Sequence, residues 1–80
     1  MALKPDEMDA VFGALASEPR RRILDILMKE PGCNVNRVCE FFDIGRVAVM
    51  KHLDVLEGAN LVVAVRRGRD VRRGRKIRLP

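Results

Sequence analysis

The chain has 80 residues, 48% of them hydrophobic, and a formal net charge of +5. Its length allows one domain, residues 1–80, and its apolar content excludes a disordered basic peptide. No apolar run approaches the roughly 18 residues that cross a bilayer, and no apolar signal core opens the chain, so we expect a cytoplasmic protein without membrane insertion.

Basic charge gathers at the C-terminal end. Up to Ile44 the chain carries six basic and eight acidic side chains, whereas the rest carries a formal charge of +7. The last fifteen residues hold seven arginines and one lysine against a single acid, Asp70. A basic end on a mildly acidic body is typical of a protein that meets a polyanion.

Two helices are predicted first, over Pro5–Ala16 and Pro19–Lys29. Ser17 suits the capping position of the second helix. Arg20, Arg21 and Arg22 begin that helix, and a solvated face and a phosphate contact are both open for them. The first helix carries four apolar residues at helical spacing, which either complete the core or contact a second copy of the chain: Met8, Val11, Phe12 and Leu15.

Two further helices are joined by a tight turn. Asn34 can cap a short helix over Val35–Phe42, and a three-residue turn with a glycine separates it from a helix over Arg46–Glu57. We expect the latter to be buried through Val49, His52, Leu53 and Leu56. Two helices joined in this way are typical of a helix-turn-helix, whose second helix enters the major groove of DNA.

The hydrophobic period then changes from helical to alternating. Leu61–Arg66 and Arg75–Leu79 are predicted to be two strands of a hairpin, with Gly68 and Gly74 on either side of the loop and the position of the turn open between them. The predicted fold class is therefore α+β, mostly α. It is a winged helix-turn-helix of about four helices followed by a two-stranded β-hairpin wing.

In this fold the outward face of Arg46–Glu57 would read double-stranded DNA. Arg46 suits guanine edges, and Lys51 suits phosphate or guanine. Val47 and Met50 suit thymine methyl groups. An arginine-rich wing reaches the adjacent backbone or minor groove. The candidate wing contacts are Arg66, Arg67, Arg69, Arg72, Arg73 and Arg75.

Two segments carry a family resemblance. Residues 12–27, FGALASEPRRRILDIL, and residues 43–62, DIGRVAVMKHLDVLEGANLV, resemble the opening and the recognition segment of ArsR-type winged-helix repressors. With the wing, the resemblance covers about residues 10–79. It implies a bacterial or archaeal DNA-binding transcriptional regulator, usually a homodimeric repressor. The family also dimerises through a helix after the wing. With only helix 5–16 available here, we expect a weak homodimer, or a monomer that pairs on DNA.

The chain departs from the family pattern at several positions of the recognition segment. Gly45 stands in place of a serine, Val47 of a proline and Met50 of a serine. Asn60 replaces a glycine, and Asp54 replaces a residue that is often basic. A negative charge at Asp54 opposes nearby phosphates.

No residues suggest a metal, a cofactor or catalysis. The family's thiol sensor positions correspond to Asn34 and Asn36, so we interpret Cys33 and Cys39 as small buried residues and expect no metal. His52 is expected to be structural or a phosphate donor. No catalytic constellation occurs at usable spacing, so we expect no enzyme, and no small-molecule effector is identifiable.

A second interpretation remains open beside a DNA-binding regulator. The apolar recognition face and Asp54 also suit a winged-helix protein-interaction module, such as an antirepressor or a complex subunit that binds an acidic partner. RNA binding and nonspecific nucleoid association are further alternatives.

Overall fold

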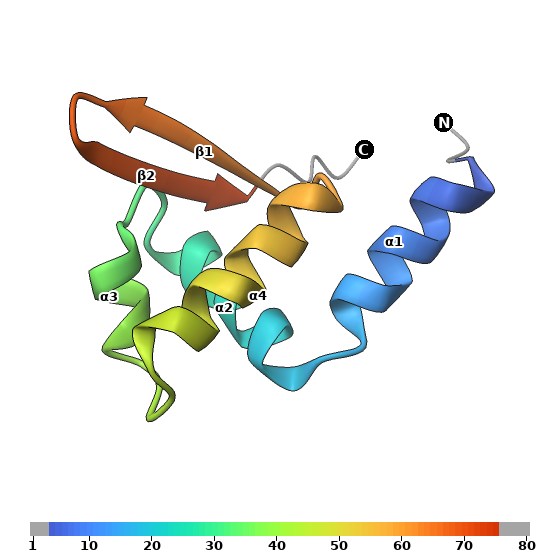
Figure 1. Cartoon of the computed structure of the whole chain (residues 1–80), viewed down its shortest axis with the longest axis horizontal. Coiled ribbons are helices and arrows are strands. Elements are labelled where there is room, and N and C mark those ends of the chain that lie inside the picture. Colours follow the sequence, from blue (N-terminus) through green and yellow to red (C-terminus); the bar gives the residue numbers. More distant parts are fainter. Residues whose placement is uncertain (1–3, 76–80) are drawn as a thin grey trace.

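The computed structural model describes residues 4–75, apart from the side chains of Arg67, Asp70 and Arg75. Figure 1 shows α2, α3 and α4 packed together, with α1 on one side and the hairpin on the other. This confirms the expected winged helix-turn-helix. None of the helices within 4–75 is long and apolar enough to cross a membrane. The elements are α1 (Pro5–Leu15), α2 (Glu18–Lys29), α3 (Val35–Cys39), α4 (Arg46–Gly58), β1 (Val62–Arg67) and β2 (Asp70–Arg75).

The helices begin at the capping residues predicted from the sequence. The Ser17 hydroxyl accepts a hydrogen bond from the Arg20 backbone N–H at 3.5 Å, and Asn34 Oδ1 accepts one from the Arg37 N–H at 3.0 Å. Both interactions satisfy a helix N–H that has no partner within the helix. Gly45 precedes α4 without a side-chain cap, as its missing side chain requires.

Helix α3 is three residues shorter than predicted. The N–H groups of Phe41 and Phe42 donate to the carbonyls of Val38 and Cys39 at 3.1 Å. These i to i−3 bonds tighten the chain into turns, so the predicted end at Phe42 was wrong. The other helix ends lie within one residue of their predicted positions.

Helix α4 ends in a left-handed residue, as the sequence predicts. Asn60 has a φ of 62°, and the Leu61 N–H donates back to the Leu56 carbonyl at 2.9 Å. Asparagine tolerates this conformation better than most residues with a side chain. The reversal directs the chain from α4 straight into β1.

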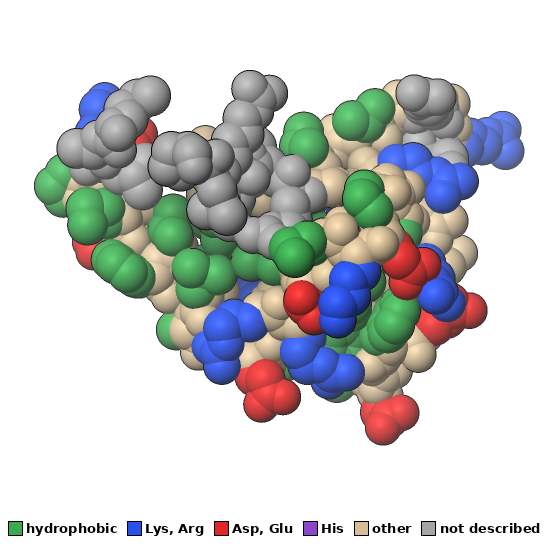
Figure 2. Space-filling model, turned by 180° about the vertical axis from the view of Figure 1, so that it is seen from behind, with side chains coloured by type: hydrophobic (Ala, Val, Ile, Leu, Met, Phe, Trp, Pro, Cys, Tyr) green, Lys and Arg blue, Asp and Glu red, His purple; other side chains and the backbone are tan. Residues whose placement is uncertain are grey.

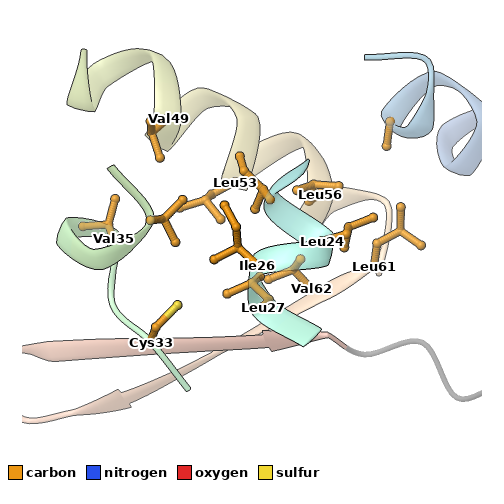
Figure 3. Packing of buried hydrophobic residues seen from close by; sticks show 13 residues of the cluster. Leu24, Ile26, Leu27, Cys33, Val35, Val49, Leu53, Leu56, Leu61 and Val62 are labelled. Carbon is orange, nitrogen blue, oxygen red and sulfur yellow. The ribbon is translucent and has the colours of Figure 1, made fainter. Parts of the chain in front are cut away.

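The core lies between α2, α3, α4 and the base of the hairpin. Figure 3 shows Val49, Leu53 and Leu56 of α4 on the side of the helix that faces Ile26 and Leu27 of α2. Helix α1 contributes one residue, Ala14, to the buried set. The buried hydrophobic residues are Ala14, Ile23, Leu24, Ile26, Leu27, Cys33, Val35, Val38, Val49, Leu53, Leu56, Leu61 and Val62.

The hairpin turns at Gly68, not at Gly74. Arg67 pairs with Asp70, which leaves a two-residue turn, and Gly68 has the positive φ of 61° that the first central position of such turns favours. The predicted second strand was therefore wrong, because β2 already begins at Asp70. Of that predicted strand, residues 76–79 lie outside the described residues.

The two faces of the hairpin differ in their environment. Val62 and Arg73 are buried, and Val71 is half-buried, on the face that lies against the helices. Val63 and Val65 lie on the opposite face and are 41% and 49% exposed. The wing is therefore attached by one face, mainly near its base.

Candidate nucleic-acid interface

The outward face of α4 matches the predicted recognition face in its exposure. Arg46, Lys51 and Asp54 are exposed, and Val47 is 70% exposed. Met50 is half-buried, which makes it the least accessible of the predicted contacts on this helix. An apolar side chain exposed as fully as Val47 gains nothing from the core, so its position suits contact with a partner.

Arg46 is held by the neighbouring helix. Its guanidinium donates a hydrogen bond to the Asn36 side-chain oxygen of α3. The sequence pattern gives no indication of this contact, because Asn36 matches only a thiol position of the family's metal sensor. The bond joins the two helices of the helix-turn-helix at the start of α4, where base contacts are made in this motif.

A polar hollow lies between α3, α4 and the wing. Its volume is about 230 Å³. The hollow brings Arg46, at the start of α4, near Arg69, at the turn of the wing, although 22 intervening residues separate them in the chain. Three cationic side chains, Arg46, Arg69 and Arg73, line this hollow, which makes it suited to an anion such as a phosphate. Its lining residues are Asn34, Val35, Asn36, Arg46, Met50, Arg69, Val71 and Arg73.

The predicted wing arginines fall into three groups. Arg66, Arg69 and Arg72 are exposed, Arg73 is buried, and only the backbone is described for Arg67 and Arg75. Arg73 is 7% exposed, and its Nε donates to Glu57 Oε1 of α4 at 2.9 Å. The placement of Arg73 in an exposed loop was therefore wrong: it lies in β2, on the face turned toward the helices.

The three arginines of α2 make contacts within the protein. Arg20 Nε donates to the Ala14 carbonyl at 2.8 Å, and a second nitrogen donates to Gly13 at 3.1 Å. Arg21 donates to the Leu15 carbonyl at 2.6 Å. Helix α1 has no basic residue in its own last turn, so α2 supplies the cations that its C-terminal carbonyls attract.

The other arginine contacts support the fold as well. Arg22 donates to the Phe41 carbonyl at 3.0 Å and lies 4.5 Å from the centroid of the Phe42 ring. The Arg37 guanidinium bonds Glu30 and Glu40, whose carboxylates raise its pKa further above its ordinary value. Of the two uses open for the α2 arginines, these contacts favour a structural one.

The cysteines and His52 do not form a cluster. Cys33 is buried, and burial, together with the charge of Glu30, raises the pKa of its thiol. Cys39 is half-buried, and His52 is half-buried with Nδ1 3.4 Å from an Arg20 nitrogen. Within the described part of the chain, no three His, Cys, Asp or Glu side chains lie close enough to hold a metal ion.

Helix α1 presents an apolar face to solvent. Phe12 is 65% exposed and Met8 is 42% exposed, whereas Val11 and Leu15 are half-buried. Figure 2 shows hydrophobic side chains gathered at the α1 end of the molecule. The sequence left open whether these four residues complete the core or contact a second copy of the chain. Val11 and Leu15 pack against the core, whereas Met8 and Phe12 remain exposed.

Comparison with known proteins identifies relatives among transcriptional regulators. No model of a protein family matches the chain. An HTH-type transcriptional regulator of Bacillus subtilis, YuzN, is 39% identical over 67 residues, which cover 76% of this chain and 73% of YuzN. The transcriptional repressor SdpR of the same organism is 33% identical over 61 residues, 76% of this chain and 67% of SdpR.

Solved structures show the same fold. A crystal structure of an ArsR family transcriptional regulator superposes with a TM-score of 0.82 and 28% identity, over 94% of this chain and 76% of that one. The homodimeric winged helix-turn-helix domain Mb0332 of Mycobacterium bovis gives a TM-score of 0.80 and 25% identity, over 89% and 65%. These relatives are transcriptional regulators and do not favour the protein-interaction alternative.

Proposed function

This chain belongs to the ArsR family of winged helix-turn-helix transcriptional regulators, and we propose that it represses transcription by placing α4 in the major groove of a specific DNA site. The observation that carries this proposal is the hollow where Arg46 of α4 and Arg69 of the wing turn lie together. A helix and a wing that share one cationic hollow suit two neighbouring grooves of one duplex. Chromosomal DNA as the target also supports a cytoplasmic location.

Base selectivity is assigned to the start of α4. Arg46 pairs with the acceptors of guanine, while Val47 and Met50 contact thymine methyl groups. Lys51 contacts phosphate or guanine. Asp54 is exposed on the same helix and repels phosphate, so it favours a position over the open groove rather than over the backbone.

The wing and Lys51 supply affinity through the DNA backbone. Three wing arginines are exposed, namely Arg66, Arg69 and Arg72, whereas Arg73 is paired within the protein. With about four phosphate contacts, the logarithm of the affinity falls with the logarithm of the salt concentration with a slope of about −3.6. Arg67 and Arg75 remain predictions from the sequence, and each would steepen this slope by about 0.9.

Selection of duplex sites from random DNA, sequenced after binding at two salt concentrations, tests the proposal. We expect one enriched motif that persists at the higher salt, because base contacts depend less on counterion release than phosphate contacts do. The absence of both an enriched motif and duplex binding at low salt would refute the function.

Two alanine variants separate the roles of helix and wing. Arg46→Ala should cost about tenfold in affinity for the selected site and blur the preference at one base position. Arg69→Ala should weaken binding to all sequences about equally and reduce the salt slope by about 0.9. If both variants change only uniform affinity, the assignment of base readout to Arg46 fails.

We also propose that the chain forms a weak homodimer through α1. The exposed Phe12 and Met8 support this, as does the homodimeric state of the Mycobacterium bovis domain. Sedimentation equilibrium should show self-association that Phe12→Asp abolishes, while Val63→Asp, at an exposed valine of the wing, leaves it unchanged. Paired half-sites about one helical turn apart should then appear in the selected DNA. Equal effects of both variants would place the interface elsewhere.

A further inference from the structure

Arg73 is the one buried charged residue in the described part of the chain. Its side chain is 8% exposed and reaches Glu57 in the last turn of α4, with Nε 2.9 Å from Oε1. The Glu57 side chain is 27% exposed. This ion pair joins the middle of the wing to the end of the recognition helix.

The backbone of the same residue fastens the wing to a second place. The Arg73 N–H donates to the Cys33 carbonyl at 3.1 Å, and the Gly32 N–H donates to the Arg73 carbonyl at 3.0 Å. One residue of β2 is thus tied to the loop before α3 by its main chain and to α4 by its side chain. The main-chain bonds reach the loop before α3, and the side-chain ion pair reaches the end of α4.

The hairpin needs such attachments to keep one orientation. An isolated two-stranded hairpin is at best marginally stable in water, because one of its faces must be covered. Here the outer face leaves Val63 and Val65 exposed, and among the described side chains of the inner face Val62 and Arg73 are buried and Val71 is half-buried. The orientation of the wing turn, which carries Arg69, therefore depends on few contacts.

We propose that Arg73 and Glu57 are positioning residues of the DNA interface, whose buried ion pair sets the wing at the angle that lets Arg69 and Arg46 engage one duplex together. This inference rests on the proposed function. When the Arg73–Glu57 ion pair is removed, the hairpin remains folded, but its turn is no longer held in one orientation. Arg69 must then be ordered when DNA binds, so it loses most of its contribution to the affinity. A preorganised wing avoids that ordering cost.

A double-mutant cycle on duplex binding tests the inference. Arg73→Met removes the guanidinium, keeps an apolar stem in the same space and leaves Glu57 a carboxylate that solvent can reach. The matched control is Arg72→Met, which removes the same charge from the adjacent residue on the opposite face of β2. The factor by which Arg69→Ala weakens binding to the selected site is measured in the wild type and in each background.

We expect Arg69→Ala to cost about tenfold in the wild type and in Arg72→Met, but less than about twofold in Arg73→Met. The salt slope of Arg73→Met should also be shallower than that of the wild type by about 0.9, and adding Arg69→Ala should not reduce it further, because the Arg69 phosphate contact is already lost. A merely structural role for Arg73 would lower the melting temperature and leave the Arg69→Ala factor unchanged.

Each other outcome is decisive. Three results would overturn the inference while the wild type still binds duplex DNA. They are an equal Arg69→Ala factor in all three backgrounds, an equal reduction of that factor in both methionine variants, and no effect of Arg69→Ala in the wild type. Absence of duplex binding by the wild type would instead refute the proposed function. If Arg73→Met does not fold, the same cycle with Glu57→Gln decides, and an undiminished Arg69→Ala factor there overturns the inference.

Discussion

Replacement of Arg20 by alanine should destabilise the protein more than most substitutions of residues near the surface do. Arg20 donates to the Ala14 and Gly13 carbonyls at the end of α1 and lies beside His52 of α4. Alanine leaves those carbonyls without their cation, and α1 has no basic residue in its last turn to replace it. The attachment of α1 to the rest of the fold is therefore weakened.

The expected loss of stability follows from these contacts. The partly buried bond to Ala14 has a charged donor and contributes about 1.5 kcal/mol, whereas the exposed bond to Gly13 adds little. A cation at a helix C-terminus contributes about 0.5 kcal/mol more. A total of about 2 kcal/mol lowers the melting temperature of a domain of this size by about 8–16 °C.

Thermal melting followed by far-ultraviolet circular dichroism measures this change, since the chain has no Trp or Tyr for fluorescence. Arg21→Ala is the matched control, because it removes a neighbouring arginine of α2 that makes one exposed bond, to Leu15. We expect the control to lower the melting temperature by less than about 4 °C. Equal melting temperatures for the two variants would refute the capping role of Arg20.

Three further variants or reactions test separate features. Asn36→Ala should free the Arg46 guanidinium and reduce discrimination at the base it reads by about threefold, measured by competition with single-base variants of the selected site; an unchanged profile would contradict the role of Asn36. In a Cys39→Ala background, iodoacetamide should alkylate Cys33 more slowly than an ordinary thiol at neutral pH, because only the thiolate reacts and the Cys33 pKa is raised. The alkylation rate should increase about tenfold with each pH unit until the pH reaches that pKa. Because the Cys33 pKa is higher in the folded than in the unfolded protein, the neutral thiol contributes its full share to the free energy of unfolding below the ordinary thiol pKa of 9.0. That contribution is lost as the pH rises from 9.0 through the folded pKa. Asn60→Ala should lower the melting temperature by about 4–8 °C and Asn60→Gly by less, because only alanine is strained at a φ of 62°; an equal loss would point to the side chain instead.

Much of the fold could be predicted because its signals are local. Ser17 and Asn34 act as the predicted helix caps, and Asn60 takes the left-handed conformation expected of it. The helical period likewise predicted that Val49 and Leu53 would be buried and Val47 exposed. These properties depend on residues within a few positions of one another.

The errors concern properties set by packing. Gly68 and Gly74 both suit a turn, and local pattern does not choose between them, so the second strand was placed too late. The burial of Arg73 depends on Glu57, sixteen residues earlier, which no charge count can reveal. The proximity of Arg69 to Arg46 likewise arises only when the wing packs beside the helices.

The exposed apolar face of α1 has a consequence for how the protein responds to its own abundance. Phe12 and Met8 are its exposed apolar residues, so if the chain pairs weakly through this face, as we propose, few copies are paired at low copy number. Occupancy of a paired site then rises with the square of the protein concentration. Once one copy is bound, two half-sites on one duplex raise the effective concentration of the second copy. A small change in synthesis would thus produce a steep change in repression.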